Sequence, residues 1–239
     1  MTELLILVPA RGGSKRVPGK NLRLFGDRPL LAHTAAAITE SGIEAPVLLT
    51  TDDAAIAALG RELGWIVPFL RPDHLAGDLS PSIDAVIHAL DWFAAERGGD
   101  PDLVLVLQPT SPLRGGACLS PALELLRHRP DLDSVVGTTA LHIPPANLYF
   151  ADDDGRAIPI AKSDQRRPVY VPNGAVYIAR TQAVRRDHTL YAGTIAPLVM
   201  DKARSLDVDT ETDFLIGEAL LAAGLPEPQT SPASPSRGT

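Results

Sequence analysis

The chain has 239 residues and a formal net charge of −7, and 45% of its residues are apolar and 21% charged. This composition is typical of a soluble globular protein of one α/β domain, and the acidic balance argues against a nucleic-acid partner, since nucleic-acid binders usually carry a basic face. Cys118 is the only cysteine, which excludes an intrachain disulfide and a metal site made of cysteines.

The first residues, MTELLILVPA, contain the first predicted strand, Leu4–Val8. They lack a basic leader, and their apolar run of about five residues is too short for a secretory or membrane-spanning helix. No later segment reaches the ~18 uninterrupted apolar residues that a membrane-spanning helix needs. We therefore expect a cytoplasmic protein without a membrane partner.

Further short apolar runs predict strands, and segments of helical periodicity lie between them. The predicted strands are Val47–Thr50, Leu103–Leu107, Ser134–Gly137 and Ala175–Ala179, and the predicted helices are Leu30–Glu40, Ala54–Leu63 and Ser82–Glu96. Ser80 and Pro81 are the predicted cap and first-turn proline of the last helix. Strands that are apolar throughout indicate a sheet covered on both faces, and the strand–helix alternation predicts a doubly wound, mostly parallel α/β sheet.

The stretch LVPARGGSKRVPGKN directly follows the first strand, at the edge where ligands of such sheets bind. Its adjacent glycines allow a phosphate to approach backbone N–H groups, and Arg11, Lys15 and Lys20 place long cations on both sides. The glycine spacing fits neither a Walker A loop nor a G-x-G-x-x-G dinucleotide fingerprint. The stretch therefore predicts a triphosphate site, with a solvated charged turn as the alternative.

Six motifs occur along the chain, in the order ARGGSKRVPGKN (residues 10–21), TDD (51–53), RP (71–72), LQPTSPLR (107–114), NGAVYI (173–178) and DVDTETDF (207–214). Together they resemble the acylneuraminate cytidylyltransferase family, the enzymes that make CMP-activated acidic sugars, over roughly residues 4–220. The resemblance implies a Rossmann-like nucleotidyltransferase fold and a homodimer. It also implies Mg²⁺-dependent transfer of CMP from CTP to the hydroxyl of a sialic-acid-like sugar, with release of pyrophosphate.

The resemblance implies a nucleotide site that joins the basic loop to later positions. Its residues are Ala10, Arg11, Gly12, Gly13, Ser14, Lys15, Lys20, Asn21, Arg71, Ser80 and Gln108. The Gln108 amide can donate and accept hydrogen bonds at once, which matches the mixed edge of cytosine. Arg11 and Lys20 are the candidate catalytic cations for the charge of the leaving pyrophosphate. The alternatives are that Gln108 only holds the PTSP turn, that Arg71 is a surface ion-pair residue, and that Ser80 only caps a helix.

Asp207 and Asp209 are separated by one residue, so in an extended segment both carboxylates face one side while Val208 faces the core. Two like charges so close are unfavourable unless a cation joins them, and Mg²⁺ is usually held by one or two carboxylates plus substrate phosphate oxygens. We expect these two aspartates to bind Mg²⁺, with Asp209 also catalytic. We expect Thr210 and Asp213 to form the capping box of the next helix, and the alternative for Asp207 and Asp209 is that they merely lead into that helix.

The acceptor region is the stretch KSDQRRPVYVPNGAVYI. By resemblance, the residues that would hold the acidic sugar are Gln165, Arg166, Tyr170 and Asn173. N-acetylneuraminate enzymes of the family carry basic residues at nearby positions where this chain has uncharged residues, Asp164 and Val171. The acceptor is therefore expected to be a relative such as legionaminate, pseudaminate or another acidic metabolite. The alternatives are 3-deoxy-octulosonate or a phosphonate as acceptor, a nucleotide-sugar-dependent glycosyltransferase, and a nucleotide-binding protein without turnover.

Residues 1–224 are predicted to form the cytidylyltransferase domain. Prolines, the run DDDG and mixed charges interrupt the strand–helix rhythm over residues 141–172, which predicts an excursion from the sheet that serves as acceptor lobe or dimer contact. Residues 225–239 are rich in Pro, Ser and Thr and are expected to be disordered.

Overall fold

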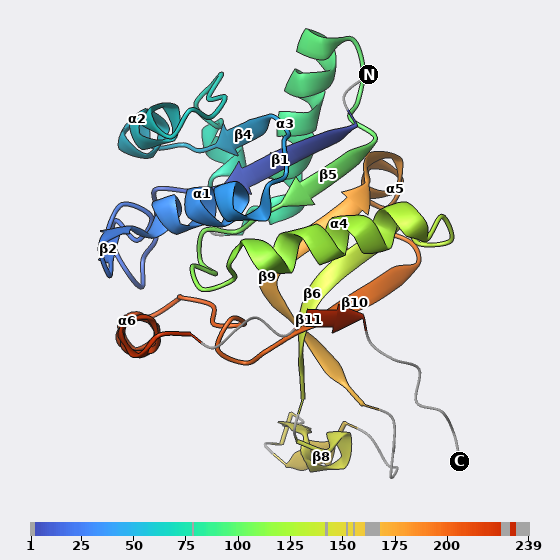
Figure 1. The fold of residues 1–239 in the computed structure, drawn as a ribbon. Helices are drawn as coiled ribbons and strands as arrows, with labels where there is room; N and C mark the ends of the chain where they lie inside the picture. The colour runs from blue at the N-terminus through green and yellow to red at the C-terminus, as the bar shows by residue number, and fades with distance from the viewer. Residues whose placement is uncertain are drawn as a thin grey trace.

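A seven-stranded sheet runs through the centre of the protein (Figure 1). The computed structural model describes residues 3–77, 79–141, 143–151, 153–154, 156–160, 168–225 and 230–232. The strands of the sheet are β1 (Leu4–Pro9), β4 (Val47–Thr50), β5 (Leu103–Val106), β6 (Ser134–Ala140), β9 (Tyr170–Arg180), β10 (Ile195–Met200) and β11 (Thr230–Pro232), in the spatial order β11-β10-β6-β9-β5-β1-β4.

Helices cover both faces of this sheet (Figure 1). They are α1 (Leu30–Ser41), α2 (Ala54–Glu62), α3 (Ser82–Arg97), α4 (Leu119–His128), α5 (Thr181–Asp187) and α6 (Glu211–Ala223). In β1, Leu4, Ile6 and Val8 pack with α1, α2 and α4, while Leu5 and Leu7 pack with α3 and α5. Because successive strand residues face opposite sides, burial on both sides requires the unbroken apolar run seen in the sequence.

The sheet is mixed. β1 pairs parallel with β4 and β5, and β6 pairs parallel with β10, but β9 runs antiparallel to both of its neighbours, β5 and β6. The predicted doubly wound, mostly parallel α/β architecture is confirmed. β10 was not predicted, since Pro197 interrupts its apolar run and proline weakens a strand assignment.

The start of α3 differs from the prediction. Pro81 occupies the N-cap position, and no side chain caps the helix. The Ser80 hydroxyl instead donates to the His74 carbonyl (Oγ–O 2.9 Å), which closes the turn before the helix. The prediction of Ser80 as a cap is therefore wrong, because its side chain bonds backward along the chain.

The connection from β6 to β9 leaves the sheet, as Figure 1 shows. Within it, β7 (Tyr149–Ala151) pairs antiparallel with β8 (Ala157–Pro159), and this pair lies away from the central sheet. A second small hairpin, β2 (Leu24–Phe25) with β3 (Arg28–Pro29), precedes α1. None of the helices in the described ranges is long and apolar enough to span a membrane.

The expectation of a disordered tail is wrong for Thr230–Pro232, which form β11 and pair antiparallel with β10. Without this strand β10 would present an unpaired edge, and covering such an edge satisfies its backbone groups. Residues 226–229 and 233–239, also included in that expectation, lie outside the described residues.

The capping box of α6 was predicted correctly and has a measurable role in stability. The Asp213 carboxylate accepts from the Thr210 backbone N–H (2.7 Å), and the Thr210 hydroxyl accepts from the Asp213 N–H (3.3 Å). We expect Asp213→Ala to lower the free energy of unfolding by about 1 kcal/mol in urea denaturation, because it removes the acceptor of otherwise unpaired N–H groups. Asp213→Asn keeps one acceptor oxygen and should lose less, and equal stability of all three proteins would contradict the prediction.

Candidate active site

A cleft of about 620 Å³ opens where the basic loop, the end of β5 and the segment before α6 meet. This volume lies in the range of roughly 300–1,000 Å³ that is usual for small-molecule sites. The predicted residues that line it are Arg11, Ser14, Lys15, Lys20, Asn21, Arg71, Ser80, Gln108, Asp207 and Asp209. Residues separated by almost 200 positions are thus brought to one cavity.

The start of the basic loop is anchored by two backbone hydrogen bonds. The buried Ala10 donates its N–H to Thr50, and the Gly12 N–H donates to Asp52 Oδ1 (2.9 Å). A Cβ on Gly12 would lie 2.7 Å from Asp53, so only glycine fits this contact. Ala10 and Gly12 therefore hold the loop against the β4–α2 turn and are not among the residues that line the cleft. Gly13 is also not among them, and a Cβ there would meet no atom within 4 Å.

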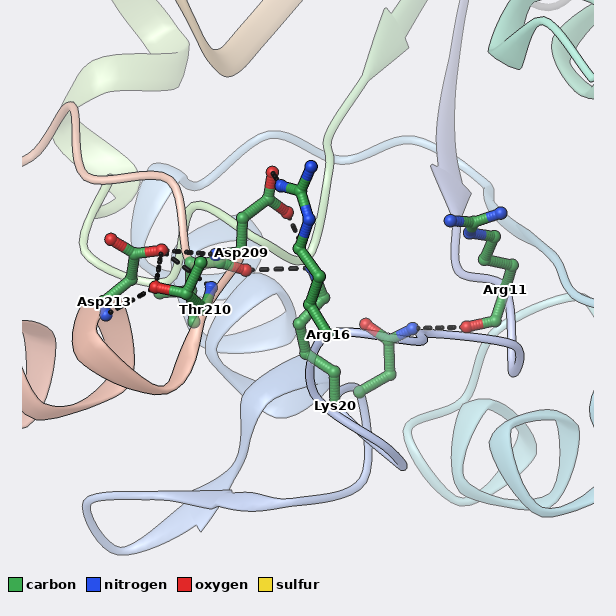
Figure 2. Close-up of polar contacts among 8 residues, drawn as sticks. Arg11, Arg16, Lys20, Asp209, Thr210 and Asp213 are labelled. Atoms are coloured by element: carbon green, nitrogen blue, oxygen red, sulfur yellow. Dashed lines mark hydrogen bonds and ion pairs between the residues drawn. The ribbon is translucent and has the colours of Figure 1, made fainter. Parts of the chain in front are cut away.

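Lys20 joins the loop to the aspartate segment (Figure 2). Its Nζ lies 2.9 Å from Asp209 Oδ1 and donates to the Val208 carbonyl at 2.9 Å. Arg16 lies further from the same carboxylate, with Nη1 3.7 Å from Oδ2. The two segments meet here because Val17 and Val208 are buried in one apolar cluster. Figure 2 shows Arg16 and Lys20 directed toward Asp209, while Arg11, at the start of the loop, lies apart from this carboxylate.

Asp207 and Asp209 face the cleft, as predicted, while Val208 is fully buried between them. Burial raises the pKa of Asp207; a hydrogen bond with Thr110 opposes this increase, and the charge of Asp209 adds to it. A cation would relieve both the burial and the repulsion of the two carboxylates. Among the described residues, no three or more His, Cys, Asp or Glu side chains are placed so that they could hold a metal ion together. An ion held by Asp207 and Asp209 would therefore need further oxygen ligands from a substrate.

Arg71 lines the cleft and is largely buried there, rather than exposed on the surface. It donates from Nη2 to the Thr50 carbonyl (2.6 Å) and from Nε to the Thr50 hydroxyl (3.2 Å). Burial lowers its pKa, the Asp52 charge opposes this, and Arg11 adds to it. The alternative of a surface ion-pair residue is therefore excluded. Asp52, which receives the loop and faces Arg71, is a site residue that sequence reasoning missed, although the TDD motif contains it.

Gln108 follows β5 and its amide lies beside Gly174. A Cβ built on Gly174 would lie 3.0 Å from Gln108 Oε1, 3.6 Å from Ser111 Oγ and 3.9 Å from Asp207 Oδ2. Gly174 also has a positive φ of 76°, which a side chain would strain. These four residues form a polar wall that links the end of β5 to the aspartate pair.

Two tyrosines near this wall were also missed. Tyr177 on β9 is buried, and its hydroxyl lies 3.3 Å from the hydroxyl of Tyr191. Burial raises the pKa of Tyr177, and the hydrogen bond to Tyr191 and the Asp207 charge add to the increase. The motif NGAVYI contains Tyr177, but its apolar neighbours indicated only a strand.

Two of the predicted acceptor residues, Tyr170 and Asn173, are described by the structure and do not line the cleft. Tyr170 pairs with Ala140 at the outer start of β9 and is not among the lining residues. Asn173 is buried, and its amide is satisfied within the protein: it donates to the Ser205 hydroxyl (2.9 Å) and accepts from the Ala175 N–H (3.1 Å). Its side chain therefore holds the backbone beside Gly174. Gln165 and Arg166 lie outside the described residues.

Comparisons of the sequence and of the fold with known proteins both find cytidylyltransferases. The family described as Cytidylyltransferase matches residues 5–139. The CMP-N,N'-diacetyllegionaminic acid synthase of Legionella pneumophila is 34% identical over 225 residues, covering 91% of this chain and 96% of that protein. The N-acylneuraminate cytidylyltransferase of Escherichia coli O18:K1:H7 is 31% identical over 218 residues, covering 89% of this chain and 51% of that protein, so the chain spans about half its length.

The fold is also that of a solved enzyme. A CMP:2-keto-3-deoxy-manno-octonic acid synthetase complexed with CTP superposes with a TM-score of 0.69 at 17% identity, covering 93% of this chain and 99% of that one. At this identity the likeness shows the shared fold alone. The family match and the two sequence relatives go further, because they extend over most of the chain. The chain therefore belongs to the cytidylyltransferase family.

Proposed function

We propose that the protein transfers CMP from CTP to the hydroxyl of an acidic sugar and releases pyrophosphate. The observation that carries the proposal is the meeting of a glycine-rich basic loop and a pair of aspartates across one cleft. Such a cleft offers cations to a triphosphate and carboxylates to a metal ion. The similarity to a CMP-N,N'-diacetyllegionaminic acid synthase supports the same reaction class.

In this proposal the basic loop binds the triphosphate and its charge assists the leaving group. Arg11 and Lys15 line one part of the cleft, and Lys20 lies beside Asp209. Gln108 and Arg71, which line the same cleft, would contact the base. The reaction needs no covalent intermediate, so its rate would depend on positioning and on stabilising the charge that develops on the pyrophosphate.

We also propose that Asp207 and Asp209 hold Mg²⁺. The raised pKa of Asp207 and the closeness of the two carboxylates fit a site that a hard cation would complete. When bound, Mg²⁺ would supply positive charge to the phosphate oxygens of the nucleotide. Lys20, already paired with Asp209, would keep that carboxylate oriented toward the cleft.

The reaction is tested by pyrophosphate release from CTP and Mg²⁺ with a panel of acceptors. The panel contains N,N'-diacetyllegionaminate, N-acetylneuraminate, pseudaminate, 3-deoxy-octulosonate and one phosphonate. We expect release with a nine-carbon acidic sugar, most readily with N,N'-diacetyllegionaminate because of the similarity above. A nucleotide-sugar-dependent glycosyltransferase would release no pyrophosphate from CTP, and a protein that binds no CTP would contradict the proposal.

We further propose a cytoplasmic homodimer, the location following from the use of cytoplasmic CTP. The hairpin β7–β8 and its neighbours expose Ile143, Tyr149, Phe150 and Ile160, each at least half exposed. An apolar patch of this kind on a projecting element is typical of a contact between proteins. A second copy of the chain would cover it.

The dimer makes a prediction for solution mass. Light scattering should give about twice the chain mass of 25.4 kDa, and Phe150→Asp should give the mass of one chain because it places a charge in the apolar contact. Leu24→Asp, at an equally exposed apolar side chain on β2, is the matched control and should leave the dimer intact. A wild-type mass of one chain would contradict the dimer.

A further inference from the structure

Arg16 is a cation of the basic loop that was not among the predicted nucleotide-site residues, although it lines the cleft. Its side chain is 73% exposed, and its Nη1 lies 3.7 Å from Asp209 Oδ2. This distance is that of an ion pair without a direct hydrogen bond. No other ionic partner of Arg16 lies within the described ranges of the chain. The guanidinium is therefore held weakly, by one carboxylate oxygen.

Lys20 contacts the other oxygen of the same carboxylate and is held more firmly. Its Nζ lies 2.9 Å from Asp209 Oδ1 and also donates to the Val208 carbonyl, and its side chain is only 10% exposed. Each oxygen of Asp209 thus faces a cation, Oδ1 a fixed one and Oδ2 one on an exposed side chain. A metal ion that binds Asp209 through Oδ2 must compete with Arg16.

The place of Arg16 in the loop gives it access to both Asp209 and the cleft. The next residue, Val17, is fully buried in one apolar cluster with Val208. The backbone of Arg16 is therefore anchored beside the aspartate segment, while its exposed guanidinium is free to change rotamer. A triphosphate in the cleft offers this guanidinium two parallel hydrogen bonds, a stronger arrangement than the 3.7 Å contact with Asp209.

We propose that Arg16 couples the binding of nucleotide and metal ion: it neutralises Asp209 in the absence of nucleotide and moves to a phosphate group when CTP binds. The inference rests on the proposed function, in which Asp207 and Asp209 hold Mg²⁺ and the loop holds the triphosphate. The move leaves Asp209 Oδ2 to the metal ion. Mg²⁺ alone therefore meets a partly neutralised carboxylate, and by linkage each of the two ligands strengthens the binding of the other.

The test is calorimetric titration of the protein with MgCl₂ alone and, separately, with CTP in the presence of EDTA. We expect Arg16→Met to bind Mg²⁺ about threefold more tightly than the wild type, because an exposed cation no longer competes for Asp209. The same variant should bind CTP about tenfold more weakly, because it lacks a charged donor to phosphate. A residue that only stabilised the loop would weaken both, so opposite shifts identify the coupling. Arg16→Lys keeps the charge and should reduce both shifts.

Arg129→Met is the matched control. Arg129 is an exposed arginine that pairs with Asp131 at 2.6 Å and does not line the cleft, so both affinities should equal those of the wild type. Unchanged or weaker Mg²⁺ binding by Arg16→Met, or its unchanged affinity for CTP, overturns the proposal. Failure of the wild type to bind CTP even with Mg²⁺ would instead contradict the proposed function.

Discussion

Replacing Asp207 with asparagine is expected to lower the turnover number at least ~10²-fold while the melting temperature stays the same or rises. The folded-state pKa of Asp207 is raised above its ordinary value. Its carboxyl group therefore favours the folded state at low pH, and this advantage is lost as the pH rises through the raised pKa. At neutral pH the ionised group destabilises the fold, and asparagine removes that charge together with the proposed Mg²⁺ ligand.

Asp209→Asn should lower the turnover number as much as Asp207→Asn does, but it should lower the melting temperature instead of keeping or raising it. It removes the charge of the 2.9 Å ion pair with Lys20, whose side chain is only 10% exposed, and leaves Lys20 at most a neutral acceptor at residue 209 beside the Val208 carbonyl. Because Asp209 itself is half exposed, the pair stabilises the fold by no more than about 1 kcal/mol, and the melting temperature should fall slightly. The opposite stability effects of the two variants would show that the loss of turnover does not come from unfolding.

Pyrophosphate release and thermal unfolding measure both effects on the same samples. Asp131→Asn is the matched control, because Asp131 pairs with Arg129 at the surface and does not line the cleft. It should keep the wild-type turnover. Wild-type turnover of Asp207→Asn or Asp209→Asn at saturating Mg²⁺ would remove that residue from the reaction.

Local sequence patterns predicted the parts of the structure that depend on neighbours in the chain. The unbroken apolar run of β1 predicted a strand covered on both faces, and the one-residue spacing of Asp207 and Asp209 predicted a buried Val208 between two cleft-facing carboxylates. The capping box of Thr210 and Asp213 is equally local. Each of these features follows from the period of a strand or the hydrogen bonds of one helix turn.

Features that depend on distant contacts could not be predicted in this way. An apolar run carries no direction, so the antiparallel course of β9 depends on the path of the excursion that precedes it. Asn173 was expected to contact a sugar. Its amide instead bonds to the Ser205 hydroxyl and to the Ala175 N–H, just after the left-handed residue Gly174. Arg114 belonged to a recognised motif, yet nothing in its neighbours indicates complete burial.

Replacing Lys20 with methionine is expected to lower turnover at least ~10²-fold, since this cation is held where charge on the leaving pyrophosphate would develop. Methionine keeps much of the buried stem, so the apolar contacts of the loop survive the change. Lys202→Met, at an exposed lysine outside the cleft, is the matched control and should keep the wild-type rate. Wild-type turnover of Lys20→Met would contradict the assignment.

Lys20→Met also distinguishes two possible roles of Lys20, both compatible with its 2.9 Å contact with Asp209: neutralising the leaving group and orienting the carboxylate. If Lys20 neutralises the leaving group, Lys20→Met should weaken inhibition by added pyrophosphate about tenfold or more, because product and transition state share that charge. If Lys20 only orients Asp209, inhibition by pyrophosphate should stay unchanged while the Mg²⁺ concentration for half-maximal rate rises. We expect the first outcome, weaker inhibition by pyrophosphate. The second outcome requires poorer Mg²⁺ binding, but removing a cation next to Asp209 leaves the carboxylate pair more negative, which favours Mg²⁺ binding.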